Sequence, residues 1–316
     1  MKATILTLLL PLALQLNAAA PGAVPSHIVS IPTACVRGSS AHSSELVSQA
    51  LMGTPVAMTD SVGEWIGVEL PDGYRGYINR SGLRRLDGES LADWKRSARL
   101  VATCAETAGV MSDSTTHGHR LSYLVNGAIA QGEIPAGGEW ARVTLPDGTN
   151  GFVEAKHVAP LEQVAHGGTD TGLIISTALA AAGAPYLWGG TTLLAPDCSG
   201  LVKRAFFATG LILPRDASQQ ALTGIELPAN RPDLWIAGDL LFFGSESPGA
   251  DPQRITHVGV YMRDGRFVHS SGRVLTSSVS AVDPLFINRP VVKAVRILGC
   301  EDTPGIIRLS SHPWYF

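Results

Sequence analysis

The first half of the chain repeats one pattern of hydrophobic and polar positions at an interval of 75 residues. In each copy, apolar and polar residues alternate after a tryptophan, as in a half-buried strand, and Pro-Asp-Gly then supplies a tight turn. A supersecondary unit that occurs twice predicts two small antiparallel β-barrels, with a connector over 87–97 and a linker over 164–171. The matching segments are Gly63-Glu64-Trp65 with Gly138-Glu139-Trp140, Leu70-Pro71-Asp72-Gly73 with Leu145-Pro146-Asp147-Gly148, and Gly76-Tyr77-Ile78 with Gly151-Phe152-Val153.

The second half mixes helical and strand patterns. Apolar residues at helical spacing predict helices over 171–183 and 198–209, and Asp197 is the natural N-cap of the second. Apolar runs predict strands over 238–243, 256–262 and 266–269, of which the last two form a hairpin. An α+β domain is therefore expected behind the two barrels.

The loop of this hairpin decides whether two histidines face each other. A two-residue loop would place His257 and His269 on opposite faces, because side chains alternate along a strand. A three-residue loop, 263–265 with Gly265 left-handed, pairs Met262 with Arg266 and brings His269 opposite Gly259. We predict the three-residue loop, so that the two imidazoles are neighbours on one face.

These elements suggest a thiol nucleophile at Cys198. The first turn of a helix offers unpaired amides and the positive end of the helix dipole, which favour a thiolate. His257 would accept the proton of Cys198, and His269 would fix the tautomer of His257 as the third member of a triad. The same three residues could hold zinc, but no fourth ligand is evident, so we predict no metal and no other cofactor.

Composition narrows the classes of function. Lys and Arg number 24 against 27 Asp and Glu, and only 16% of the 316 residues are charged. This balance excludes a strongly basic nucleic-acid binder and a charged disordered chain, so no nucleic-acid partner is expected. Four cysteines allow pairing in an oxidising compartment, and a bridge between Cys35 and Cys104 is left open.

Residues 1–20 have the order of a secretory signal. Lys2 precedes an apolar run over 5–16, and small residues precede Pro21. The run is too short to span a bilayer, and no later apolar run is long enough. We therefore expect export to the periplasm or cell envelope, with no stable membrane insertion after cleavage near Ala19 or Ala20.

The repeats resemble bacterial SH3 domains, and the second half resembles the NlpC-type cysteine peptidases of bacterial cell walls. The second resemblance covers about 172–298 and implies a papain-like α+β fold. The implied domains are a signal peptide over 1–20, SH3-like domains over 24–90 and 91–165, and a peptidase domain over 170–316. The motifs are Pro185-Tyr186-x-Trp188-Gly189-Gly190, Asp197-Cys198-Ser199-Gly200-Leu201, Leu213-Pro214-Arg215-Asp216, Gly238-Asp239-Leu240, His257-Val258-Gly259-Val260-Tyr261 and Val268-His269.

The architecture is most similar to γ-D-glutamyl-L-diamino acid endopeptidases, which implies hydrolysis of murein stem peptides. The resemblance implies that Cys198 is the nucleophile, His257 the base and His269 the third member. The Tyr186 hydroxyl is implied to help the oxyanion hole beside the Cys198 amide. The implied substrate groove includes Trp188, Asp197, Ser199, Arg215 and Asp216.

The resemblance also implies recognition of a free N-terminal L-alanine. Glu45 and Tyr77 of the first SH3-like domain, together with Asp197, match the residues that receive its amine. Carboxylates suit amines, and Arg215 suits a substrate carboxylate. Two simpler interpretations stay open, in which Asp197 is only a helix cap and Arg215 with Asp216 is only a surface pair. Ala217 stands where relatives have serine, which removes one expected hydrogen bond of the groove.

Alternative functions are a non-catalytic wall-binding protein, in which the SH3-like repeats do the work, and a murein amidase using the same thiol. The sequence does not distinguish diaminopimelate from lysine at the third position of the stem peptide. It also leaves open the oligomeric state and the role of an insertion loop over 244–254.

Overall fold

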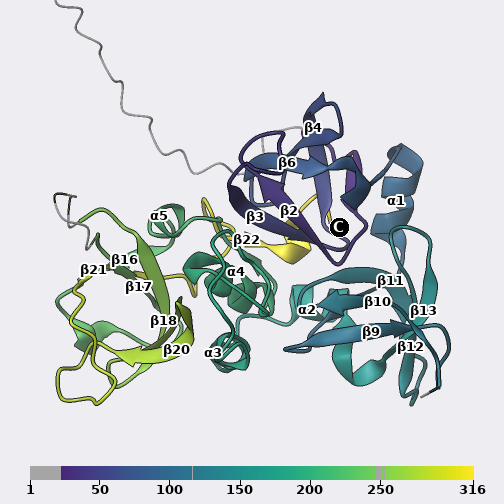
Figure 1. Cartoon of the computed structure of the whole chain (residues 1–316). Coiled ribbons are helices and arrows are strands. Elements are labelled where there is room, and N and C mark those ends of the chain that lie inside the picture. The colour runs from purple at the N-terminus through teal and green to yellow at the C-terminus, as the bar shows by residue number, and fades with distance from the viewer. Residues whose placement is uncertain (1–22, 116, 246–248, 250, 252) are drawn as a thin grey trace, which may run out of the picture.

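Two small β-barrels and an α+β domain make up the described part of the chain. The computed structural model describes residues 23–115, 117–245, 249, 251 and 253–316. The expected signal segment and part of the 244–254 loop lie outside these residues. Figure 1 shows the teal-green to yellow-green α+β domain at the left and centre, with the purple first barrel and the blue-teal second barrel one above the other at the right. None of the helices among the described residues is both long and apolar enough to cross a membrane.

The two barrels confirm the predicted duplication. Each is a seven-stranded antiparallel sheet, and their strand orders, β3-β2-β6-β5-β4-β1-β7 and β10-β9-β13-β12-β11-β8-β14, are equivalent. The first contains β1 (His27–Val29), β2 (Thr33–Arg37), β3 (Leu46–Leu51), β4 (Pro55–Val62), β5 (Trp65–Glu69), β6 (Arg75–Asn79), η1 (Arg80–Gly82) and β7 (Leu83–Arg85). The second contains β8 (Arg99–Ala102), β9 (Thr107–Met111), β10 (Arg120–Val125), β11 (Ile129–Glu133), β12 (Trp140–Thr144), β13 (Asn150–Glu154), η2 (Ala155–His157) and β14 (Val158–Pro160).

Short helices connect these units. The connector expected over 87–97 is helix α1 (Gly88–Arg96), which Asp87 caps through the backbone amide of Ser90. Helix α2 (Leu161–His166) follows the second barrel and occupies part of the expected linker. Gly167 and Gly168 then lead into the α+β domain.

The α+β domain packs its helices against an antiparallel sheet of order β16-β21-β17-β18-β19-β20. Both predicted helices form at the expected positions, α3 (Thr171–Ala180) and α4 (Cys198–Phe207). The strands are β15 (Leu211–Ile212), β16 (Ile225–Leu227), β17 (Leu240–Phe243), β18 (His257–Arg263), β19 (Arg266–Ser271), β20 (Arg273–Ser278), β21 (Val291–Arg296) and β22 (Ile307–Arg308). The other helical segments are α5 (Ala217–Gln220), η3 (Pro232–Leu234) and η4 (Leu309–Ser311).

The hairpin of β18 and β19 corrects the predicted loop. The turn has two residues, Asp264 and Gly265, both at positive φ, and Arg263 pairs with Arg266. Such a turn alone would separate the histidine faces, but a register shift between Tyr261 and Arg263 inserts one extra residue. Val260 consequently pairs with Val268, which is the register that the three-residue loop was expected to give. The predicted loop length was wrong, but because of the bulge His257 and His269 still lie on the same face of the hairpin, as predicted.

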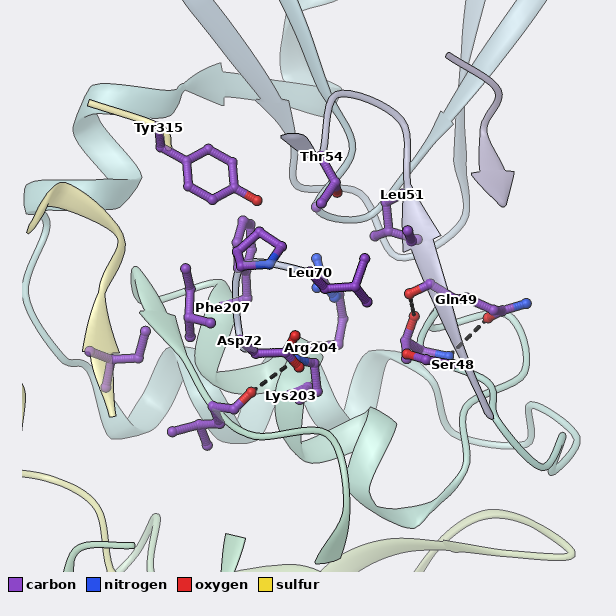
Figure 2. Close-up of a pocket in the computed structure, with 17 residues that line it drawn as sticks. Ser48, Gln49, Leu51, Thr54, Leu70, Asp72, Lys203, Arg204, Phe207 and Tyr315 are labelled. Atoms are coloured by element: carbon purple, nitrogen blue, oxygen red, sulfur yellow. Dashed lines mark hydrogen bonds and ion pairs between the residues drawn. The ribbon is translucent and has the colours of Figure 1, made fainter. Parts of the chain in front are cut away.

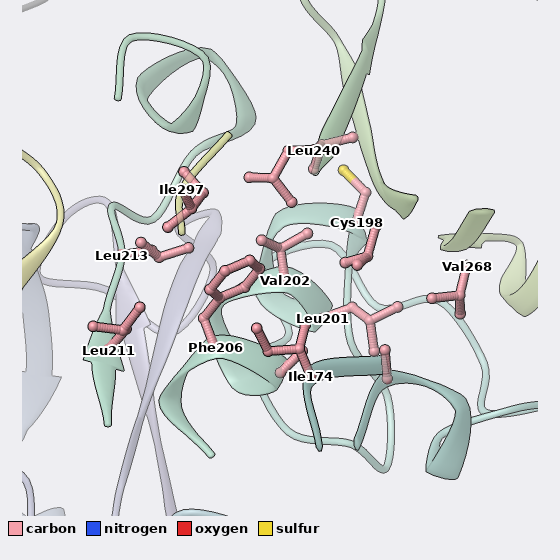
Figure 3. Packing of buried hydrophobic residues seen from close by; sticks show 14 of the residues in the cluster. Ile174, Cys198, Leu201, Val202, Phe206, Leu211, Leu213, Leu240, Val268 and Ile297 are labelled. Atoms are coloured by element: carbon pink, nitrogen blue, oxygen red, sulfur yellow. The ribbon is translucent and has the colours of Figure 1, made fainter. Parts of the chain in front are cut away.

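Helix α4 is held by the hydrophobic core of this domain (Figure 3). Its side chains Leu201, Val202 and Phe206 are fully buried, and they pack in one cluster with Leu240 of β17 and Val268 of β19. This apolar face repeats at helical spacing, so burying it fixes both the position and the rotation of α4. The first turn of α4, which carries Cys198, is thereby held against the sheet.

The first barrel docks on the outer side of α4. A cavity of about 60 Å³ lies at this junction, where Asp72 of the barrel forms a buried ion pair with Lys203 of α4 (Figure 2). Tyr315 of the C-terminal tail also lines it. The tail reaches the first barrel again where His312 donates from Nε2 to the Pro71 carbonyl at 2.9 Å. The barrel is thus fastened to the α+β domain by buried polar contacts.

The four cysteines are all free. Cys35 is exposed on the first barrel, and Cys104 lies in the second. The bridge between them that the sequence left open does not form.

Candidate active site

Cys198 occupies the first turn of α4, as predicted. Asp197 caps the helix by accepting a hydrogen bond of 2.7 Å from the backbone amide of Gly200. Cys198 is 7% exposed, and the backbone amides of Val258 and Ser199 lie close enough to its sulfur to favour a lower pKa of the thiol, against the larger effect of burial. Because Val258 lies in β18 next to His257, the thiol faces the strand that carries the predicted base.

The two predicted histidines are hydrogen-bonded to each other across β18 and β19, and a serine continues this chain of hydrogen bonds. His257 Nε2 lies 2.7 Å from His269 Nδ1, and His269 Nε2 lies 2.9 Å from the Ser277 hydroxyl oxygen. Gly259, opposite His269, has no side chain, and a Cβ there would lie 2.5 Å from the Phe267 ring. If His257 donates from Nε2 and His269 from its own Nε2, Nδ1 of His257 is left to accept the thiol proton.

Burial keeps both reacting groups neutral. It raises the pKa of the Cys198 thiol to about 11, and the nearby Asp197 charge adds to this effect. It also lowers the pKa of His257 to about 3, with further contributions from His269 and Arg289. The prediction of a thiolate was therefore wrong, because burial and the Asp197 charge raise the pKa of the thiol more than the amides at the helix start lower it. A thiol in this state would have to give up its proton as its sulfur attacks a substrate.

Tyr186 stands beside the thiol as a neutral donor. It lines the same cavity as Cys198. Burial raises its pKa, and the charges of Cys198 and Asp197 raise it further. Its hydroxyl therefore keeps its proton at neutral pH and can donate a hydrogen bond to a developing oxyanion.

Asp197, Ser199 and Arg215 form a buried network. The Asp197 carboxylate accepts hydrogen bonds from the amides of Gly189 and Gly200, from the Ser199 hydroxyl and from both terminal nitrogens of Arg215. Arg215 is 2% exposed and also donates to Ser48 of the first barrel at 3.2 Å. Asp197 is thus more than a cap, Arg215 is not a surface residue, and their charges neutralise each other.

A cavity of about 490 Å³ extends from Cys198 to the first barrel. Trp188, 61% exposed, donates from its indole nitrogen to the Glu45 carboxylate at 2.7 Å, so the barrel forms part of the cavity wall. The described residues lining it include eleven from the sequence motifs and the first barrel: Glu45, Val47, Tyr74, Tyr186, Trp188, Gly189, Asp197, Cys198, Ser199, Arg215 and Asp216.

Tyr74, and not the predicted Tyr77, is among the described residues lining the cavity. The Tyr77 hydroxyl donates to Asp60 at 2.9 Å. Tyr74 instead lines the cavity, and its hydroxyl lies 3.5 Å from the Asp216 carboxylate. Burial raises the pKa of Asp216, although Arg215 opposes the shift. Among the described residues lining the cavity, Glu45 and Asp216 are the acidic groups that form no ion pair with an arginine, whereas Asp197 is paired with Arg215.

Three participants were missed by the sequence analysis. Ser277 lies two residues beyond Leu275, which pairs with His269, so strand alternation could have placed it on the face of the histidines. The place of Tyr74 in the cavity depends on how the first barrel packs against the α+β domain, which the sequence pattern does not show. Arg254, in a loop to which no role was assigned, also lines the cavity.

A cysteine at a helix start, with a relay of two imidazoles, defines a cysteine hydrolase. Among the described residues, no group of three or more His, Cys, Asp or Glu side chains could hold a metal ion.

Comparisons with known proteins agree with this class. Residues 183–296 match the model of the NlpC/P60 family, and residues 36–83 match that of the bacterial dipeptidyl-peptidase Sh3 domain. A gamma-D-glutamyl-L-lysine dipeptidyl-peptidase of Bacillus subtilis is 31% identical over 232 residues, with 71% of each chain covered. Dipeptidyl-peptidase 6 of Lysinibacillus sphaericus is 28% identical over 251 residues, which cover 77% of this chain and 87% of that one. An NlpC/P60 family crystal structure from Bacillus cereus has a TM-score of 0.72 at 19% identity, covering 86% of this chain and 99% of the other.

The chain therefore belongs to the NlpC/P60 family of cysteine peptidases. The recognised resemblance, the fold class and the enzymatic class are all confirmed.

Proposed function

We propose that the protein is an exported endopeptidase that cuts murein stem peptides between D-glutamate and the diamino acid. Its substrates are stem peptides with a free N-terminal L-alanine. The observation that carries this proposal is the Trp188–Glu45 hydrogen bond, by which the first barrel closes part of the Cys198 cavity with a carboxylate. The activity for which the Bacillus subtilis relative is named, that of a gamma-D-glutamyl-L-lysine dipeptidyl-peptidase, supports the same reaction class.

The first step acylates the enzyme. The Cys198 sulfur attacks the γ-carbonyl carbon of D-glutamate while its proton moves to Nδ1 of His257. His269 stabilises the resulting imidazolium by accepting from Nε2 of His257. The Tyr186 hydroxyl and the Cys198 amide donate to the oxyanion. The tetrahedral intermediate collapses, the C–N bond breaks, and His257 returns the proton to the departing amine.

The second step releases the product. Neutral His257 removes a proton from water as its oxygen attacks the thioester carbonyl. Collapse breaks the C–S bond, and the proton returns from His257 to the sulfur. The products are L-Ala-γ-D-Glu and a peptide that begins with the diamino acid.

Glu45 and Asp216 are the proposed partners of the alanine ammonium. Asp197 is unsuited to this role, because five donors of the protein already occupy its oxygens. An acylated alanine would carry no charge and would leave exposed Glu45 and half-buried Asp216 without a cation. Preference for a free amine then follows from the cost of an unpaired carboxylate.

The test compares L-Ala-γ-D-Glu-diaminopimelate with the same peptide acetylated on its alanine. The native enzyme should cut the free peptide with a kcat/KM about 100-fold higher, since the amine forms charge-assisted hydrogen bonds. Glu45→Gln should reduce this ratio to about tenfold, and Cys198→Ala should abolish both reactions while the circular dichroism spectrum is unchanged. Equal turnover of the two peptides by the native enzyme would contradict the amine recognition.

Mass analysis of the products separates the alternatives. Release of L-Ala-γ-D-Glu supports the proposed bond, whereas release of intact stem peptide from glycan would indicate an amidase. Binding to murein without any product would indicate a wall-binding protein. Export is tested by N-terminal sequencing of the mature chain from the envelope fraction, where cleavage near Ala19 or Ala20 is expected.

A further inference from the structure

Arg254 is a cation at the active-site cavity that the mechanism does not use. Two arginines are among the described residues lining the cavity, Arg215 and Arg254. Arg215 is held by Asp197 in a buried ion pair. Arg254 is exposed, and no ion pair to its side chain is seen among the described residues. The remaining acidic groups, Glu45 and Asp216, belong to the part of the cavity assigned to the alanine ammonium.

The position of Arg254 relates it to the leaving group. It lies three residues before His257, the base that must protonate the departing amine. Thr256 tethers this segment to the end of β17, donating from its amide to the Phe243 carbonyl at 3.1 Å and from its hydroxyl to the Gly244 carbonyl at 3.0 Å. The Arg254 amide donates to the Asp251 carbonyl at 3.0 Å. The guanidinium is therefore carried on a segment that is fastened beside the base.

We infer that Arg254 binds the side-chain carboxylate of diaminopimelate, so that the enzyme prefers diaminopimelate over lysine in the third position. This inference rests on the proposed function. The diamino acid supplies the departing amine, so this residue of the substrate lies on the side of the cleaved bond where His257 returns the proton. Diaminopimelate carries a carboxylate at the end of that side chain and lysine does not, which makes a guanidinium beside the base a means of discrimination.

The experiment measures kcat and KM for three peptides that share L-Ala-γ-D-Glu. Their third residues are diaminopimelate, diaminopimelate amidated at the side-chain carboxylate, and lysine. The native enzyme should prefer the first by about tenfold in kcat/KM, as one charge-assisted hydrogen bond on a solvent-accessible side chain provides. Arg254→Gln should remove this preference mainly by raising KM, because the contact is present before the chemical step. Arg254→Lys should retain part of it.

Arg263→Gln is the matched control. Arg263 is an exposed arginine at the other end of β18, paired at 3.9 Å with exposed Asp264, and should leave the preference unchanged. The inference is overturned if the native enzyme cuts the three peptides equally or if Arg254→Gln keeps the preference. A fourth peptide, with D-isoglutamine in place of D-glutamate, lacks the free α-carboxylate of that residue. The inference is also overturned if Arg254→Gln impairs cleavage only of the peptides that carry this α-carboxylate, whatever their third residue. If no peptide is cut at the γ-D-glutamyl bond, the proposed function itself fails, which is a distinct result.

Discussion

The two barrels share one fold but differ in what they contribute to the active site. Their strand orders are equivalent, and their registers correspond, since Arg37 pairs with Leu46 in the first and Met111 with Arg120 in the second. The described residues of the catalytic cavity include Glu45, Val47 and Tyr74 of the first barrel, whereas the others come from the peptidase domain. A duplicated scaffold has thus become specialised in one copy.

The two barrels differ in the side chains at equivalent positions and in their contacts with the peptidase domain. By the strand registers, His119 of the second barrel corresponds to Glu45, and Thr149 corresponds to Tyr74. The first barrel also contacts the catalytic loop, where Thr191 donates from its amide to the Gln49 side chain at 2.9 Å. The first barrel therefore lines the cavity for two reasons. It carries Glu45 and Tyr74 at positions where the second barrel has His119 and Thr149, and it contacts the peptidase domain beside the cavity.

The largest predicted effect tests the docking of the first barrel. Lys203→Met removes the partner of Asp72, whose side chain is only 3% exposed, and so leaves a buried carboxylate without its cation. The free energy of unfolding should fall by about 3 kcal/mol, as expected when one partner of a buried ion pair is lost. Urea denaturation followed by tryptophan fluorescence measures the change.

Lys156→Met provides the control in the second barrel. Its ion pair with Glu154 is largely exposed, with 69% and 42% of the two side chains accessible, so no measurable loss is expected. Equal destabilisation by both variants would mean that the junction of the first barrel contributes no special stability.

Local features of the active site were predictable from the sequence. Asp197 and the apolar spacing after Cys198 specify a capped helix, and both signals lie within one segment of the chain. The facing histidines were also expected, although through the wrong loop. A two-residue turn with a bulge gives the same register as a three-residue loop, and the sequence pattern of His257 and His269 does not separate the two.

Features that depend on distant contacts were not predictable. Tyr77 and Tyr74 both belong to the same strand region, and only the docked position of the barrel decides which of them meets Asp216. Arg215 looked available to a substrate carboxylate because its ion pair with Asp197 closes only in the folded chain. The expected thiolate failed for a related reason, since the helix start of Cys198 is local but its burial is not.

A second measurement separates the stability contributed by the barrel junction from that of the paired histidines, His257 and His269. Burial lowers the pKa of His257 to about 3 from its usual 6.5, so between these values only the unfolded chain binds the proton. Stability must therefore fall as the pH decreases from about 7, by about 2 kcal/mol at pH 5 from this ring alone. His257→Gln should flatten this part of the stability curve, whereas Lys203→Met should shift the curve downward with its slope retained. An unchanged slope in His257→Gln would show that the ring is not buried in its neutral form.

The smallest predicted effect concerns the second barrel and tests whether only the first barrel contributes to substrate recognition. In the variant Glu45→Gln, the additional change His119→Glu would restore an acid at the equivalent position of the duplicated fold. Because the described part of the second barrel contributes nothing to the cavity lining, kcat/KM for the free-amine peptide should equal that of Glu45→Gln alone. A carboxylate strengthens substrate binding when it lies within hydrogen-bond distance of the substrate or shares a desolvated site with it. The attraction of a solvent-exposed carboxylate elsewhere is screened by salt. Rescue by His119→Glu would mean that the second barrel also approaches the substrate, and the specialisation of the first would then have to be abandoned.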